Sequence, residues 1–150
     1  MRVLIAEDDP VSRRLLQNYV QKWGHEVIAA VNGAEAWQYF QQQEFPLVIT
    51  DWMMPELTGP ELVQRIRAHP RPGYAYTILV TDKSQKEDVV AGMESGADDF
   101  VTKPFDRDEL HARLRAGERI VALERRLEEQ NRALREAQAA LLRNAGQSAE

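Results

Sequence analysis

The stretch Leu47-Val48-Ile49-Thr50-Asp51, followed by Trp52-Met53-Met54-Pro55-Glu56-Leu57-Thr58-Gly59, decides the fold of this chain. Residues 47–50 form a short, largely apolar run, which predicts a buried strand. Asp51 then stands at the carboxyl end of that strand. Open α/β sheets bind their ligands at the carboxyl ends of the strands. Asp51 is therefore a candidate reactive group, provided that other strands bring polar groups to the same edge.

Four further runs of this kind alternate with helical patterns along the chain. The predicted strands cover residues 2–6, 26–30, 47–51, 76–81 and 100–102. Strands that alternate with helices predict a parallel sheet covered on both faces and linked by right-handed crossovers. We therefore expect a doubly wound α/β fold, in which the end of every strand lies at one edge.

Capping residues mark the starts of three predicted helices. Asp9 precedes Pro10 as an N-cap, and Thr58-x-x-Glu61 and Ser84-x-x-Glu87 have the spacing of capping boxes. We expect the apolar faces of the first and fourth helices to pack on the sheet. The side chains expected to face inward are Val11, Leu15, Leu16, Tyr19, Val89, Val90 and Met93.

Composition bounds the function of this 150-residue chain. It has no cysteine, which excludes disulfides and thiol chemistry, and its three histidines are scattered, which disfavours a histidine metal site. The net charge of −5, without a lysine or arginine block, argues against nucleic-acid binding. No apolar run is long enough for a membrane span or a secretory signal, so we expect a cytoplasmic protein with no membrane partner.

A helical pattern runs from Asp106 to about Asn144, roughly 55 Å at the rise of an α-helix. Its second half must project from a domain of this size. Arginine and glutamate balance at six each from Glu118 onward, and apolar residues recur every seven positions, which predicts a dimeric coiled coil. Gly117 is either a hinge or a tolerated helical glycine. The seam residues are Ile120, Leu123, Leu127, Leu134 and Leu141, with Ala137 and the polar Gln130 between them.

Five polar residues fall at strand ends and define the candidate site. Glu7 and Asp8 follow the first strand, Asp51 ends the third, Thr81 ends the fourth and Lys103 follows the fifth. Three crowded carboxylates need a hard cation, and an all-oxygen site suits Mg²⁺. The ammonium and hydroxyl remain available for an anion, and a phosphoryl group fits both. The set therefore points to phosphoryl transfer with a carboxylate nucleophile.

These residues resemble a known family. Over residues 1–116 the chain is similar to the receiver domain of bacterial two-component response regulators. The resemblance rests on Glu7-Asp8, Asp51-x-x-Met54-Pro55-x-x-x-Gly59, Thr81 and Lys103-Pro104-Phe105. We accordingly expect a flavodoxin-like, doubly wound, five-stranded parallel sheet in the order 2-1-3-4-5, with an extended C-terminal helix.

The resemblance also implies a role for each matched residue. Asp51 would accept a phosphoryl group from a histidine kinase or phosphotransfer protein, and Lys103 and Thr81 would contact that group. Mg²⁺ would be held by Asp8, Asp51 and the Met53 carbonyl, with Glu7 acting mostly through water. Pro104 would follow a cis peptide bond. Such a protein phosphorylates and dephosphorylates itself but has no external substrate, so it is not an enzyme in the ordinary sense.

In the family, a threonine at the position of Thr81 and an aromatic residue at that of Phe100 switch together. They remodel the face made by the fourth helix, fifth strand and fifth helix, which is the usual dimer surface. Two residues depart from the pattern. Asp82 replaces a small residue and is expected to alter the lifetime of the phosphoryl group, and Phe100 lacks the hydroxyl of the more usual tyrosine.

The C-terminal segment resembles the signalling helix that joins receivers to output enzymes, often diguanylate cyclases. We expect a receiver domain at 1–116, a protruding linker helix at 117–145 and a disordered tail at 146–150. The chain would be either a piece of a longer regulator, which we favour, or a receiver that dimerises by itself.

Three other functions compete with this interpretation. An aspartyl-phosphate phosphatase would carry a second Asp two residues after Asp51, where this chain has Met53. A flavin or nucleotide carrier would have a Gly/Ser/Thr-rich loop after the first strand, where this chain is acidic. A scaffold without phosphorylation is disfavoured by the complete set of site residues. Trp52, next to Asp51, is expected over the mouth of the site.

Overall fold

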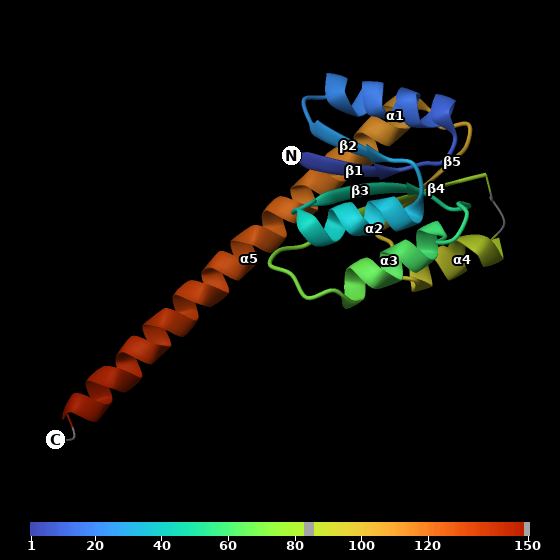
Figure 1. Ribbon diagram of the computed structural model, residues 1–150. Coiled ribbons are helices and arrows are strands. Elements are labelled where there is room, and N and C mark those ends of the chain that lie inside the picture. The colour runs from blue at the N-terminus through green and yellow to red at the C-terminus, as the bar shows by residue number, and fades with distance from the viewer. Residues whose placement is uncertain (83–85, 149–150) are drawn as a thin grey trace.

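The computed structural model describes residues 1–82 and 86–148. Its five strands form one parallel sheet in the order β2-β1-β3-β4-β5, and the predicted fold is confirmed (Figure 1). The strands are β1 (Arg2–Ala6), β2 (Glu26–Ala30), β3 (Leu47–Asp51), β4 (Tyr76–Thr81) and β5 (Asp99–Thr102). The helices are α1 (Pro10–Lys22), α2 (Gly33–Gln42), α3 (Gly59–Ala68), α4 (Lys86–Glu94) and α5 (Arg107–Ser148).

The sheet is covered on both faces, which explains the continuous apolar character of its strands. Val3 and Ile5 pack in one core cluster with residues of α1 and α5, whereas Leu4 packs in a second cluster with residues of α2 and α3. Successive side chains of a strand point to opposite faces, so a strand inside such a sheet has no polar side. The acidic residues of the site stand at or just after the carboxyl ends of β1 and β3.

Two of the predicted helix caps are present. The carboxylate of Asp9 accepts a hydrogen bond of 2.8 Å from the backbone N–H of Ser12. Thr58 and Glu61 form the reciprocal capping box at the start of α3. The box predicted at Ser84 lies outside the described residues. These caps set where α1 and α3 begin, directly after the loops that carry the site carboxylates.

The predicted inward faces of α1 and α4 are partly wrong. In α1, Leu16 and Val20 are buried, but the side chains of Val11 and Leu15 are 76% and 41% exposed. In α4, Val90 and Met93 are also exposed. A helix buries only one stripe against a sheet, and residues a further quarter-turn around stay in solvent even when they are apolar.

The start of α5 is an integral part of the body. Leu110, Leu114 and Val121 are buried in the cluster that α5 shares with α1. A Cβ on Gly117 would come within 2.6 Å of the ring of Tyr76. The glycine therefore permits close packing within a continuous helix. Val121 is the last of the buried core residues that α5 contributes.

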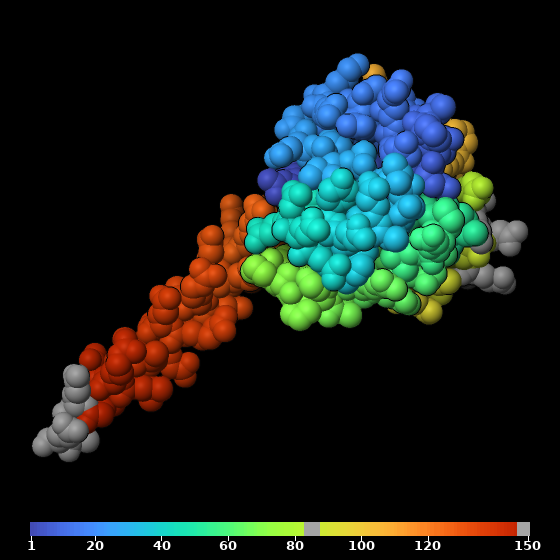
Figure 2. Space-filling model, viewed as in Figure 1, coloured from blue at the N-terminus to red at the C-terminus, as the bar shows by residue number. Residues whose placement is uncertain are grey.

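Arg125 and Glu128 still line a surface groove with Arg71 and Tyr74, and the later part of α5 protrudes from the body as a single helix (Figures 1 and 2). It continues to Ser148, so residues 146–148 are helical and the disordered tail predicted from residue 146 is wrong for them. The segment contains no proline, and a single glycine costs a helix only about 1 kcal/mol. Within the described part of the chain, no helix combines the length and the apolar character that crossing a membrane requires.

Candidate functional site

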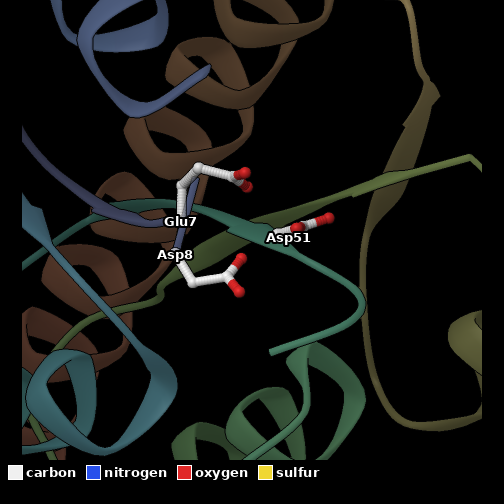
Figure 3. Close-up of side chains that lie close together, drawn as sticks. All are labelled: Glu7, Asp8 and Asp51. Atoms are coloured by element: carbon white, nitrogen blue, oxygen red, sulfur yellow. The ribbon is translucent and has the colours of Figure 1, made fainter. Parts of the chain in front are cut away.

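Three carboxylates meet where β1 and β3 end. The two strands pair in parallel, with Ala6 opposite Thr50, so the residues that follow them are neighbours. Glu7 is fully buried and Asp51 nearly so, whereas Asp8 is exposed. One oxygen from each of these three side chains lies within 4.8 Å of the other two (Figure 3). Of all the described residues, only these form such a cluster of metal-ligating side chains.

The loop after Asp51 packs tightly beneath the site. The backbone N–H of Trp52 donates a 2.9 Å hydrogen bond to Oδ1 of Asp51, and Gly59 N–H donates a 2.8 Å bond to the Trp52 carbonyl. A Cβ on Gly59 would lie 2.3 Å from the Asp51 carbonyl oxygen, so only glycine fits there. The loop also holds Glu56 at a φ of +70°, a conformation that glutamate rarely adopts.

Lys103 directly follows the edge strand β5 and places a positive charge beside the carboxylates. Its Nζ lies 3.2 Å from Oε1 of Glu7 and 3.3 Å from Oδ2 of Asp51. Its backbone N–H donates to the carbonyl of Thr81, and the peptide bond to Pro104 is cis, as the family resemblance implied. Burial acts to lower the pKa of Lys103, but the charges of Asp51 and Glu7 outweigh it and raise that pKa. The amine is therefore held as an ammonium.

The ammonium of Lys103 does not by itself neutralise and bond all the carboxylate oxygens of the site, as Glu7 shows. Burial, and then the charge of Asp51, raise the pKa of Glu7 to about 7, against the opposing effect of Lys103. Oε2 of Glu7 is buried without a hydrogen-bond partner. An unpartnered buried carboxylate oxygen within an all-oxygen acidic cluster fits a hard divalent cation such as Mg²⁺. Glu7, Asp8 and Asp51 are the side chains that could hold it.

The remaining predicted site residues lie around this cluster. Thr81 is buried at the end of β4, in register with Thr102 at the end of β5. The side chain of Met53 is exposed and ends in a soft thioether, so its backbone carbonyl is its only candidate ligand for a hard cation. Phe100 packs with Val63 and Leu79 between the sheet and the α3/α4 layer, away from the carboxylates. The structure thus brings Glu7, Asp8, Asp51 and Lys103 together, with Thr81 at the same edge.

Trp52 does not cover the mouth of the site as the sequence led us to expect. Its half-buried ring packs with Val63 and Leu79, and a Cβ on Gly92 of α4 would come within 2.5 Å of it. The reason is the alternation of side chains along an extended chain: Asp51 points to the edge, so the next residue points into the layer below.

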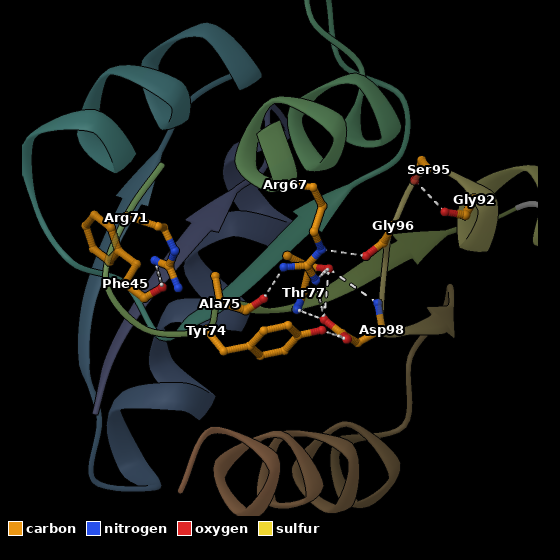
Figure 4. A network of polar contacts seen from close by, with 10 residues as sticks. All are labelled: Phe45, Arg67, Arg71, Tyr74, Ala75, Thr77, Gly92, Ser95, Gly96 and Asp98. Atoms are coloured by element: carbon orange, nitrogen blue, oxygen red, sulfur yellow. Dashed lines mark hydrogen bonds and ion pairs between the residues drawn. The ribbon is translucent and has the colours of Figure 1, made fainter. Parts of the chain in front are cut away.

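Sequence reasoning missed two arginines: Arg13 holds the loop of the site, and Arg67 ties α3 to the opposite edge of the sheet. Arg13 bonds the backbone carbonyls of Glu7 and Asp8, and Arg67 ties α3 to Asp98 in a polar network (Figure 4). An arginine on a helix usually indicates a solvated face, and nothing in the local pattern marks these two as different. Their partners lie on other elements and become neighbours only in the folded chain.

Comparison with known proteins decides the family. The family model of the response regulator receiver domain matches residues 3–115. This chain belongs to that family. A curated relative, the chemotaxis protein CheY homolog of Campylobacter jejuni, is 34% identical over 116 residues, which cover 76% of this chain and 89% of the relative. Among the described residues, the fold and the acidic cluster agree with this membership.

Solved structures of other receivers have the same fold. Response regulator protein TrrA from Thermotoga maritima, in complex with Mg²⁺-BeF, is 34% identical with a TM-score of 0.69, over 77% of this chain and 97% of that one. A probable two-component system response regulator/GGDEF domain protein is 25% identical with a TM-score of 0.76, over 81% of this chain and 50% of that one. The receiver is thus a CheY-like signalling module of the two-component type, a class that interacts with histidine kinases or phosphotransfer proteins.

Proposed function

We propose that Asp51 accepts a phosphoryl group from the phosphohistidine of a histidine kinase or phosphotransfer protein. The observation that carries this proposal is the position of Lys103, whose ammonium lies between Glu7 and Asp51 at 3.2 and 3.3 Å. A cation beside a nearly buried carboxylate can pair with the oxygens of a phosphoryl group while that group bonds to the carboxylate. Acidic residues alone would repel the incoming group.

In the proposed reaction, a carboxylate oxygen of Asp51 bonds to phosphorus as the bond from phosphorus to the donor imidazole breaks. The Trp52 N–H holds the other carboxylate oxygen and so orients the group. The ammonium of Lys103 pairs with the phosphoryl oxygens, and the hydroxyl of Thr81 hydrogen-bonds them. Mg²⁺, held by Glu7, Asp8, Asp51 and the Met53 carbonyl, would neutralise the charge that accumulates on the phosphoryl group.

Phosphorylation would be reported through Thr81 and Phe100 to the face made by α4, β5 and α5. Two features support this route. Phe100 is only partly buried in a small cluster, where a rotation displaces few contacts, and Val90 and Met93 of α4 are exposed on the outer surface. A new charge at Asp51 that draws Thr81 inward would leave space for the ring, as phosphorylation switches act by local packing changes.

The protruding part of α5 would carry the signal to a second copy of the chain and to an output domain. Ile120, Leu123, Leu127, Leu134 and Leu141 are all exposed although they are large and apolar, and their seven-residue period matches a coiled-coil seam. Diguanylate cyclase is one candidate output. It is supported by the likeness, over 81% of this chain, to the response regulator/GGDEF domain protein.

Acetyl phosphate as a small-molecule donor tests the proposal without a kinase. With Mg²⁺, intact mass spectrometry should show one added phosphoryl group, and EDTA should prevent it. Asp51→Asn should abolish labelling. Asp9→Asn is the matched control, because Asp9 only caps α1 and asparagine caps equally well. Labelling that persists in the Asp51 variant would show that the phosphoacceptor is another residue.

A further inference from the structure

The loop that carries Glu7 and Asp8 is tied down by a residue of the following helix. Arg13 lies in the first turns of α1, where its own N–H bonds the carbonyl of Asp9 at 2.9 Å. Its Nη1 reaches back to donate to the carbonyl oxygen of Glu7 at 2.9 Å and to that of Asp8 at 3.4 Å. One guanidinium thus bonds the backbones of both residues whose side chains enter the acidic cluster.

The other attachments of this loop lie on either side of Asp8. Glu7 N–H donates to the Ala30 carbonyl of β2 at 3.2 Å, and the Asp9 side chain caps α1. Within the described part of the chain, the only hydrogen bond that reaches Asp8 is the one from Arg13 to its carbonyl. The Asp8 carboxylate is exposed and has no ion pair there. The direction in which the Asp8 carboxylate points therefore depends on how the Asp8 backbone is held.

We propose that Arg13 is a positioning residue for the cation site. By holding the carbonyls of Glu7 and Asp8, it aims the two carboxylates at Asp51 before any cation arrives. The proposal rests on the proposed function, because Mg²⁺ is the ion that the site would take. Groups outside the ligand set that orient the ligands commonly change metal affinity by tenfold or more.

The sign of the effect separates positioning from simple electrostatics. A guanidinium beside an acidic cluster repels a divalent cation, so by charge alone the removal of Arg13 would strengthen Mg²⁺ binding. If Arg13 positions the carboxylates, its removal weakens binding despite the lost repulsion. The two accounts therefore predict opposite shifts in the Mg²⁺ dissociation constant.

The experiment is a Mg²⁺ titration of the full chain, followed by tryptophan fluorescence, with Trp52 adjacent to Asp51 as the reporter. Arg13→Met should raise the dissociation constant about tenfold. Arg14→Met is the matched control, since it removes the same charge from a side chain that lines a surface groove with Val11 and Leu15. Arg13→Lys should recover part of the loss, because an ammonium can still donate to one carbonyl.

A second measurement needs no cation. In metal-free protein, Arg13→Met should speed hydrogen exchange at the Glu7 amide, which donates to the Ala30 carbonyl, whereas Arg14→Met should leave it unchanged. Unchanged or tighter Mg²⁺ binding in Arg13→Met, or unchanged exchange in the loop, would overturn the proposal. If wild-type protein bound no Mg²⁺ and accepted no phosphoryl group, the proposed function would be refuted instead. The exchange data would still test whether Arg13 holds the loop.

Discussion

The guanidinium of Arg67, near the end of α3, lies 2.6 Å from the carboxylate of Asp98, in the turn before β5 (Figure 4). The same guanidinium donates to the carbonyls of Gly96 and Ala75, at 2.9 and 2.7 Å. Asp98 in turn accepts from the backbone N–H of Thr77 in β4 at 2.8 Å. This network fixes α3 against the two strands whose far ends carry Thr81 and Lys103.

Loss of Arg67 should therefore destabilise the receiver. Arg67→Met leaves Asp98, which is mostly buried, without its cation, and the free energy of unfolding should fall by about 2–4 kcal/mol. Urea denaturation measures the change. Arg65→Met is the control, because this exposed neighbour on the same helix should cost less than about 0.5 kcal/mol. Equal losses of unfolding free energy in the two variants would show that the network is not the cause.

Tyr74 should give the network a dependence on alkaline pH. Burial, and then the hydrogen bond that its hydroxyl donates to Asp98, raise the pKa of Tyr74 from 10.0 to about 12. The unfolded chain loses this proton first, so the stability contributed by Tyr74 is full below pH 10 and declines as pH rises toward 12. The gap in unfolding free energy between wild type and Tyr74→Phe should narrow over that range. Parallel pH profiles would contradict the assignment.

Glu56 should be a stabilising site for substitution. Its φ of +70° is strained for glutamate, whereas asparagine adopts this conformation more readily. Glu56→Asn should raise the free energy of unfolding by about 0.5–1 kcal/mol in metal-free buffer. Glu56→Ala removes the same charge without relieving the strain, so it should give no gain. A gain in both variants would assign the effect to charge.

The protruding helix offers a matched pair for testing the dimer seam. Leu134 and Leu142 are both 68% exposed, but only Leu134 lies on the seven-residue repeat. Leu134→Glu should weaken dimerisation about tenfold or more, because the seam would bury an unpaired carboxylate. Leu142→Glu should leave it unchanged. Sedimentation equilibrium measures both, and equal effects would mean that the seam is misplaced.

Much of the fold was predictable because both faces of this sheet are buried. Each strand had to be an apolar run, so the position at which Asp51 follows Leu47 to Thr50 was visible in the sequence. The parallel arrangement then required Glu7, Asp51 and Lys103 to meet at one edge. Asp9 and Thr58 were equally readable, because a helix cap depends on residues only three positions apart.

Contacts between helices and distant loops were not predictable in this way. The sequence indicated that α1 has apolar residues but not that Leu16 would be buried and Val11 exposed, because neighbouring stripes of a helix are equally apolar here. It placed Trp52 over the site, whereas Gly92 of α4 leaves the ring a space beneath that helix. It left Gly117 open as a hinge or a tolerated helical glycine, whereas the structure shows the ring of Tyr76 in the space where a Cβ would be.

The sequence by itself determined the α/β order, the edge at which Asp51, Glu7, Asp8 and Lys103 meet, and the family of the chain. These properties follow from local runs and fixed spacings along one strand or helix. Only the tertiary structure decided that Glu7 has an unpartnered oxygen, that Arg13 holds the loop after β1 and that Arg67 ties α3 to Asp98. Such features depend on atoms far apart in the chain, whose distances are set by how the helices pack and not by the order of the residues.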